Sequence, residues 1–305
     1  METILNKKHY RNIFYCFVGL LFINLIIYRY FLLPQFDQTL EANFTKSLAS
    51  ILDGFAISLL VTVIVGGFVF WVTPEIIKKS EMDVIAPKEI GHLLRQAVSD
   101  SRSWVYNGAC GRYTRATTLP MMASSARRQG IGRDIRITLL NPSNPLLCGE
   151  YATYRRSLKS AKHGNAWTAD RVKEEVISTV ISALRYKHEE PLLRIEIHLS
   201  NHFSVFRFDI SDQHVIVTKE DSEATGLKAD KSSYFYDSYV DDARLSERQS
   251  KRIIYNNQIP LDGELTKDNI KDLIVEVGLL TVNELQGLNL DNIVNSISAP
   301  EDPYA

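Results

Sequence analysis

Hydrophobic residues are unevenly distributed along the 305-residue chain, and the two longest apolar runs lie near its beginning. Residues 12–33 are interrupted only by Asn24 and Arg29, and residues 54–72 contain no charged side chain. An α-helix rises about 1.5 Å per residue, so each run is long enough to cross a hydrocarbon layer about 30 Å thick. The pattern predicts two transmembrane helices within residues 1–80.

Basic residues flank the outer ends of both predicted spans. They are Lys7, Lys8, Arg11, Lys78 and Lys79. The connecting segment, residues 34–53, has Lys46 as its one basic residue and three acidic residues. The positive-inside rule therefore places both termini in the cytoplasm and the short connection outside. A cleaved signal peptide is the alternative for the first run, but no small-residue cleavage site follows it.

Beyond residue 80, helical and strand periodicities alternate. Apolar residues recur at helical spacing in residues 88–99 and 169–187, which predicts two amphipathic helices. Apolar and polar residues alternate in residues 193–200, 203–210 and 214–220, which predicts three successive strands.

Between the two helices, segment 102–142 predicts a strand, a glycine-containing loop, a helix and a second strand. Thr117 or Thr118 is expected to cap this helix, with Pro120 in its first turn. Gly130 and Gly132 are expected to end it. Strand, helix and strand in this order predict a parallel βαβ unit.

The order of these elements is typical of an α/β or α+β sandwich. We predict a cytoplasmic α/β domain over residues 85–247. Its acidic part, residues 221–247, is expected to be mostly loop, with SSYFYDSYV as an edge strand or a flap over a ligand. Residues 248–305 are predicted to form small amphipathic helices.

The loop after the first strand of the βαβ unit carries the first candidate site. In α/β proteins this loop lies at the carboxyl edge of the sheet, where ligands bind. Gly108 and Gly111 are expected to let the loop bend, so that Arg112 and Arg115 project beyond the sheet with Tyr113 beside them. The planar guanidinium group of arginine can bind a phosphate group with two parallel hydrogen bonds. We therefore predict an anion-binding loop.

Charge supports an anionic partner. Residues 102–162 contain nine Arg and two Lys against two acidic residues, a net charge of +9 (11 − 2), whereas the whole chain carries −1. Residues 1–101 carry nine charges of each sign, so residues 163–305 carry −10 (−1 − 9). Such asymmetry is typical of an anion-binding surface or a charge-complementary interface. The alternative is an ordinary solvated face.

The chain has no P-loop, GxGxxG, HExxH or CxxC motif, so no metal site, cofactor or catalytic residue is predicted. Its three cysteines are Cys16, Cys110 and Cys148. Cys16 lies in a predicted span and the others in the reducing cytoplasm, so no disulfide framework is expected. A buried structural thiol is favoured over a nucleophile for Cys110.

Two sequence runs resemble a phospholipase D-like half-domain. LPMMASSARRQGIGRDIRITLLNP is similar to a helix and strand of that family, and VFRFDISDQHVIVTKED to its signature strand and hairpin. The family pattern is His-x-Lys and, after four further residues, Asp. Aligned with this pattern, the histidine falls on Val205, the lysine on Arg207 and the aspartate on Asp212. The resemblance covers about residues 102–220.

The resemblance implies phosphodiester transfer through a histidine nucleophile, but valine cannot attack phosphorus. No histidine in the chain is followed two residues later by lysine, so the sequence argues against this activity. Arg207 and Asp212 remain candidates for holding a phosphate. A structural ion pair at the hairpin is the alternative.

These observations favour a non-enzymatic membrane effector. Its cytoplasmic domain would bind an anionic small molecule, such as a nucleotide, and act through the two-helix module in the bilayer of a bacterial inner membrane. Two-span effectors of antiphage signalling systems share this layout. Gly66 and Gly67 permit close helix approach, so a homo-oligomer is expected.

Two other functions stay open. One is a membrane-bound phospholipase D-like phosphodiesterase, and the other is a membrane-tethered adaptor for protein or nucleic acid. Nucleic acid is the less favoured partner, because the aromatic residues of the basic stretch are too scattered for ordered base stacking.

Overall fold

The computed structural model divides into two compact units, Met1–Ser80 and Glu81–Ala305. It describes residues 8–36, 43–72, 79–163, 166–255, 261, 263 and 265–304. Lys7 and Lys78, on which the predicted orientation partly depends, lie outside these residues.

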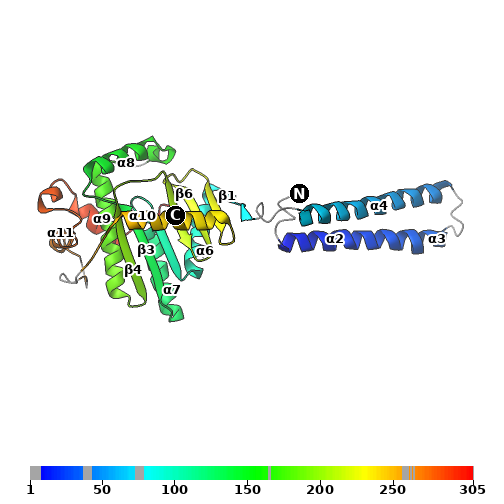
Figure 1. Ribbon diagram of the computed structural model, residues 1–305, viewed down its shortest axis with the longest axis horizontal. Helices are drawn as coiled ribbons and strands as arrows, with labels where there is room; N and C mark the ends of the chain where they lie inside the picture. Colours follow the sequence, from blue (N-terminus) through cyan, green and yellow to red (C-terminus); the bar gives the residue numbers. More distant parts are fainter. Residues whose placement is uncertain are drawn as a thin grey trace. The chain divides into compact units, whose positions relative to one another are not determined.

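The first unit consists of helices (Figure 1). They are α2 (Lys8–Ile27), a π-helical turn η1 (Tyr28–Leu32), α3 (Leu33–Phe36) and α4 (Asn43–Val72). Two stretches, Ile13–Phe36 and Asn43–Phe68, are long and apolar enough to cross a membrane. Large apolar side chains such as Phe17 and Ile64 are exposed along them, as expected of helices that face lipid. The two predicted spans are thus present as apolar helices.

The start of the second apolar helix differs from expectation. α4 begins at Asn43, which is 11 residues (54 − 43) before the predicted start of the second span. The earlier start brings Asp53 into the helix, where its Oδ1 lies 3.0 Å from Arg29 Nε. Apart from chain neighbours and the helix's own backbone, no described atom lies within 4 Å of a Cβ built at Gly66 or Gly67. Both positions therefore have open space around them, and the expected homo-oligomer stays a prediction.

The second unit is built on one mixed sheet of eight strands in the order β1-β7-β6-β5-β2-β3-β4-β8. The strands are β1 (Asp83–Ile85), β2 (Ser103–Asn107), β3 (Arg133–Leu140), β4 (Leu193–Ser200), β5 (Phe206–Ser211), β6 (His214–Lys219), β7 (Gly226–Asp230) and β8 (Lys251–Arg252). Strands β2, β3 and β4 are parallel, and every other neighbouring pair is antiparallel. The predicted α/β class and parallel βαβ unit are confirmed.

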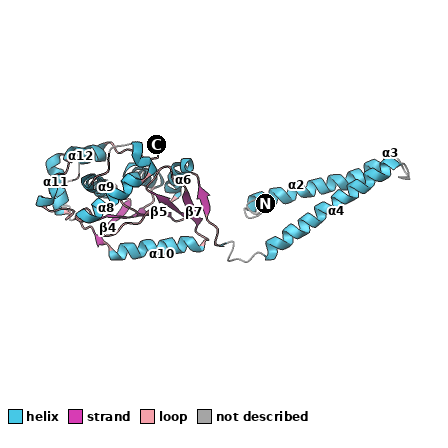
Figure 2. Cartoon of the chain, turned by 90° about the horizontal axis from the view of Figure 1, so that it is seen from above, coloured by secondary structure: helices cyan, strands magenta, loops and turns pink. Residues whose placement is uncertain are grey.

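Helices lie on both faces of this sheet (Figure 2). One face carries α10 (Tyr234–Gln249). The other carries α6 (Pro87–Asp100), α7 (Leu119–Gln129), α8 (Pro145–Ser157) and α9 (Ala169–Glu189). The small helices α11 (Lys267–Glu276), η4 (Val282–Leu285) and α12 (Leu290–Ser298) follow, and α12 packs on α9. Small helices were predicted for this part of the chain.

Alternating strand residues supply the two cores. Trp104 and Tyr106 of β2 are buried in the larger core with α6, α7, α8 and α9, whereas Val105 joins the smaller core beneath α10. Successive side chains of a strand point to opposite faces, so a strand between two helical layers must be apolar on both sides. This explains the nearly continuous apolar sequence of β2.

The prediction that residues 221–247 are mostly loop is wrong, because this segment forms β7 and most of α10. The Ser233 hydroxyl caps α10 by accepting a hydrogen bond from Phe235 N–H at 3.2 Å. Tyr236, Val240 and Ala243 then face the sheet at helical spacing. The boundary expected after residue 247 falls inside this helix.

The expected cap at Thr117 or Thr118 is also wrong. A π-helical turn, η2 (Thr114–Thr118), precedes α7, and Thr118 itself has helical dihedral angles and makes no capping hydrogen bond. The helical backbone therefore begins before these threonines and carries Arg115 on its first turn. The helix ends at Gly130 as predicted.

Candidate functional site

Three chain segments meet at the edge of the sheet where β2 ends. The loop after Asn107 leads into Arg112 and Tyr113. Strand β5 is antiparallel to β2, with Asn107 opposite Phe208, so the start of β5 lies at this edge. Strand β6 returns to the same edge, where Glu220 follows it. This edge is where α/β proteins place their ligand sites.

Arg207, near the start of β5, passes close to the loop at Gly108. A Cβ at this glycine would lie 2.9 Å from Arg207 Cγ and would also collide with the Tyr106 hydroxyl. The hydroxyl in turn accepts a hydrogen bond from Gly111 N–H at 3.1 Å. The glycine thus makes room for the stem of the arginine.

Arg207 and Asp209 form a buried ion pair. Their side chains lie on the same sheet face as Tyr106, and Arg207 Nε donates to Asp209 Oδ2 at 2.7 Å. Burial raises the pKa of Asp209 above its ordinary value, although the guanidinium opposes this shift. Arg207 is 4% exposed, and its buried Nη2 has no hydrogen-bond partner among the described residues.

Arg155 of α8 is a second buried cation, 8% exposed. Its guanidinium lies 4.6 Å from the centroid of the Trp167 ring, and its Nη1 lies 3.9 Å from Glu220 Oε2. Burial alone would lower the pKa of Arg155, but Glu220, together with smaller contributions from Tyr151 and neighbouring groups, raises the pKa above its ordinary value. Nε and Nη1 make no hydrogen bond within the described part of the chain.

Both arginines line a cleft of about 520 Å³. Its charged lining side chains are Arg112, Arg155, Arg171, Arg207, Glu220, Glu301 and Asp302. Segment 301–304 lines the cleft with two acidic residues and with Tyr304. Without this segment, the charged side chains of the lining would be four arginines and one glutamate. We refer to this space as the arginine cleft.

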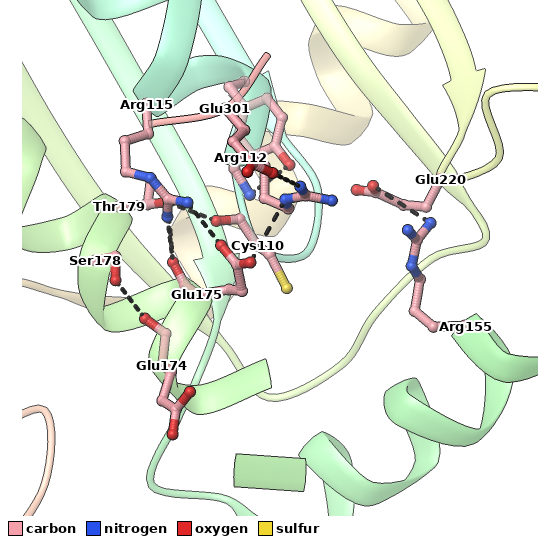
Figure 3. Close-up of polar contacts among 12 residues, drawn as sticks. Cys110, Arg112, Arg115, Arg155, Glu174, Glu175, Ser178, Thr179, Glu220 and Glu301 are labelled. Carbon is pink, nitrogen blue, oxygen red and sulfur yellow. Dashed lines mark hydrogen bonds and ion pairs between the residues drawn. The ribbon is translucent and has the colours of Figure 1, made fainter. Parts of the chain in front are cut away.

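Arg112 and Arg115 both extend to Glu175 of α9 (Figure 3). Arg112 is partly exposed, with Nε 3.5 Å from Glu175 Oε1, and it lines the arginine cleft. Arg115 Nη2 lies 2.7 Å from Glu175 Oε2, and Nη1 donates to the Glu175 carbonyl and the Thr179 hydroxyl. Its side chain is 3% exposed. The expectation that Arg115 projects beyond the sheet edge is therefore wrong.

Asp212 lies far from the arginine cleft. Asp212 follows the end of β5, whereas Arg207 is near its start, so the two residues lie at opposite ends of this strand. Asp212 Oδ2 accepts a hydrogen bond from Arg102 N–H at 3.4 Å, at the entry to β2. The alternative of an ion pair between Arg207 and Asp212 is wrong, because Arg207 pairs with Asp209. Arg207 and Asp212 also do not lie together in the cleft, where they were predicted to hold a phosphate.

The geometry thus gathers Arg112, Tyr113 and Arg207 of the predicted residues in one cleft. Sequence reasoning missed Arg155, Asp209, Glu220 and Tyr304 as parts of this site. Sequence patterns pointed to two of these residues. Arg155 is four residues from Tyr151 and so shares its helix face, and Asp209 alternates with Arg207 on an otherwise apolar strand. Nothing in the sequence linked Tyr304 to this loop.

Cys110 and Cys148 are buried, as predicted for Cys110. Burial raises the pKa of the Cys110 thiol well above its ordinary value and that of Cys148 to about 11. Since the thiolate is the reactive form, we expect neither cysteine to react with an alkylating reagent at neutral pH in the folded protein. Mass spectrometry of tryptic peptides measures this, and the guanidinium-unfolded chain is the control in which both should react. Rapid labelling of native Cys110 would contradict the buried placement.

Comparisons with known proteins give no family. No protein-family model and no curated protein matches the sequence. Among similar solved structures is TrmBL2, an archaeal chromatin protein with a novel mode of DNA binding, with a TM-score of 0.34, 9% identity, and coverage of 70% of this chain and 68% of that one. Another is Nuc from Salmonella typhimurium, a phospholipase D family member, with a TM-score of 0.29, 10% identity, and coverage of 57% and 99%. The resemblance to phospholipase D is thus weak, and neither likeness assigns a ligand or reaction.

Proposed function

We propose that this chain is a membrane-anchored sensor whose second unit binds an anionic ligand in the arginine cleft. One observation carries the proposal: two arginines, each more than nine-tenths buried, line the cleft with guanidinium N–H groups that have no hydrogen-bond partner in the described part of the protein. Buried polar groups are otherwise nearly always paired.

An anion is the partner that best fits these groups. Leaving a buried charged donor unsatisfied costs roughly 1–3 kcal/mol or more, and a phosphate or carboxylate oxygen would remove this cost. Charge-assisted hydrogen bonds are about twice as strong as neutral ones. Arg207 and Arg155 are held in place by Asp209 and by the Trp167 ring, so little side-chain entropy would be lost on binding.

The proposed function also assigns a role to the two apolar helices in the membrane. The two apolar helices would hold the second unit at the cytoplasmic surface, and ligand binding would act through them. Val205 still stands where the resembled family has its nucleophile, and it carries no group that can attack phosphorus. We therefore propose binding without turnover. The link to antiphage defence rests on layout and stays a prediction.

Titration of the detergent-solubilised full chain with pyrophosphate, followed by calorimetry, tests the proposed function. We expect saturable binding that weakens as salt is added, because the partner charges are screened. Pyrophosphate recovered intact would agree with binding alone. Absence of binding at low salt would argue for the alternative, an adaptor that uses the basic surface to bind protein.

The orientation gives a separate prediction. Basic residues flank the outer ends of both spans, so residue 40 should face away from the cytoplasm and residue 300 toward it. In intact cells, the Leu40→Cys variant should react with a membrane-impermeant thiol reagent and the Pro300→Cys variant should not. Labelling at residue 300 with protection at residue 40 would reverse the topology.

A further inference from the structure

We infer that the ligand of the arginine cleft is a phosphate ester that carries a planar ring, and that it enters by displacing segment 301–304. The inference rests on the proposed function. It comes from the segment itself, which places an aromatic ring and two carboxylates over a cluster of arginines. These are the chemical groups that a nucleotide would bring.

The side chain of Tyr304 occupies the position that we assign to the planar ring of the ligand. Its ring centroid lies 5.4 Å from Arg207 Cζ and 5.5 Å from the Tyr113 ring, in an edge-to-face arrangement. A guanidinium attracts the face of an aromatic ring, and edge-to-face rings attract each other. The same corner of the cleft would therefore accept the flat face of a base once Tyr304 has left it.

The carboxylates of the segment mark the anionic positions. Asp302 Oδ2 accepts hydrogen bonds from Arg95 Nη1 at 3.1 Å and from the Thr117 hydroxyl at 3.0 Å. Glu301 Oε2 lies 3.9 Å from Arg112 Nη2, with a side chain that is 88% exposed. This exposed pair is weak, so an incoming phosphate can compete with it.

Segment 301–304 packs closely against Gly91 of α6. A Cβ at this position would lie 2.9 Å from Tyr304 Cβ and 3.3 Å from the Tyr304 carbonyl oxygen. An alanine there would push the segment away and leave every arginine of the cleft unchanged. It would also favour the helix, since alanine exceeds glycine in helix propensity.

Segment 301–304 and the ligand would compete for the cleft, so only one of them could occupy it at a time. When a binding site is open for only a fraction of the time, the apparent dissociation constant rises by the inverse of that fraction. Removing the segment should therefore tighten binding. A base that stacks in place of Tyr304 should add affinity beyond that of the phosphate, by about tenfold or more.

The test compares four probes by calorimetry: AMP, ribose 5-phosphate, inorganic phosphate and adenosine. It uses the full chain in detergent and a variant that ends at Pro300, with Gly91→Ala and Tyr304→Ala as independent ways to dislodge the segment. We expect AMP to bind at least about tenfold tighter than ribose 5-phosphate. We also expect each of the three variants to bind AMP tighter than the full chain.

The outcomes separate this inference from the proposed function. Equal affinities for AMP and ribose 5-phosphate, both lost on Arg155→Met, would exclude the ring and leave the anion site intact. Equal AMP affinity in the full chain and in every folded variant would exclude displacement of the segment. Failure of all three phosphate probes to bind even the Pro300 variant would overturn the proposed function itself.

Discussion

Arg155→Met is expected to weaken binding of pyrophosphate and AMP about tenfold to a hundredfold. The substitution removes charge-assisted hydrogen bonds worth roughly 1.5–3 kcal/mol. Methionine keeps an apolar stem for packing on Trp167, and Glu220, which loses its partner, is partly exposed to solvent. Calorimetry on the detergent-solubilised chain measures the change, and urea unfolding verifies that the variant is folded.

A second variant addresses the other buried arginine. Arg207→Lys keeps a positive charge beside Asp209 but removes the guanidinium Nη2, so the same loss of affinity is expected with the fold retained. Arg128→Met is the matched control, because Arg128 belongs to the same basic block but is exposed near the end of α7, outside the cleft. Equal losses in all three variants would mean that binding depends on diffuse surface charge.

Arg115→Leu is expected to lower the free energy of unfolding by about 3 kcal/mol. Removing one partner of a buried ion pair typically costs about 3–5 kcal/mol, and Arg112, 3.5 Å from Glu175, would compensate in part. Affinity for pyrophosphate should change little in the protein that stays folded. Urea unfolding followed by tryptophan fluorescence gives the stability, because Trp104 and Trp167 are both buried in this unit.

The double variant Arg115→Leu/Glu175→Leu tests the cause. Replacing both charges by apolar groups removes the unpaired carboxylate, so most of the lost stability should return. If Arg115→Leu instead leaves stability unchanged and abolishes ligand binding, the residue belongs to the site, as its sequence position first suggested.

Local sequence patterns predicted most of the second unit. The βαβ segment 102–142, helix α9 and the strands β4 and β6 follow from periodicity, because each buries a continuous apolar face. The aromatic run at 234–240 led to the wrong prediction of an edge strand or a flap, because tyrosine and valine have high strand propensity. Tyr236, Val240 and Ala243 follow helical spacing, and this pattern identifies α10.

The candidate site was less predictable for two physical reasons. The backbone is already helical at Arg112, where an open loop was expected, so Arg115 lies one turn later and is buried against Glu175 of α9 instead of projecting from the sheet. The motif alignment placed Arg207 and Asp212 together, but five residues of strand separate them by roughly 17 Å. Contacts such as Tyr304 with Arg207 arise from tertiary packing alone.

A crystal structure of the full chain grown in detergent with AMP would test the central claim most directly. The account predicts phosphate oxygens within hydrogen-bonding distance of the Arg155 and Arg207 guanidinium groups, both of which have buried N–H donors without a hydrogen-bond partner among the described residues. It also predicts that Tyr304 no longer lies over Arg207. Phosphate bound outside the cleft, for example at Arg127 and Arg128 of α7, with the cleft unchanged, would contradict the account.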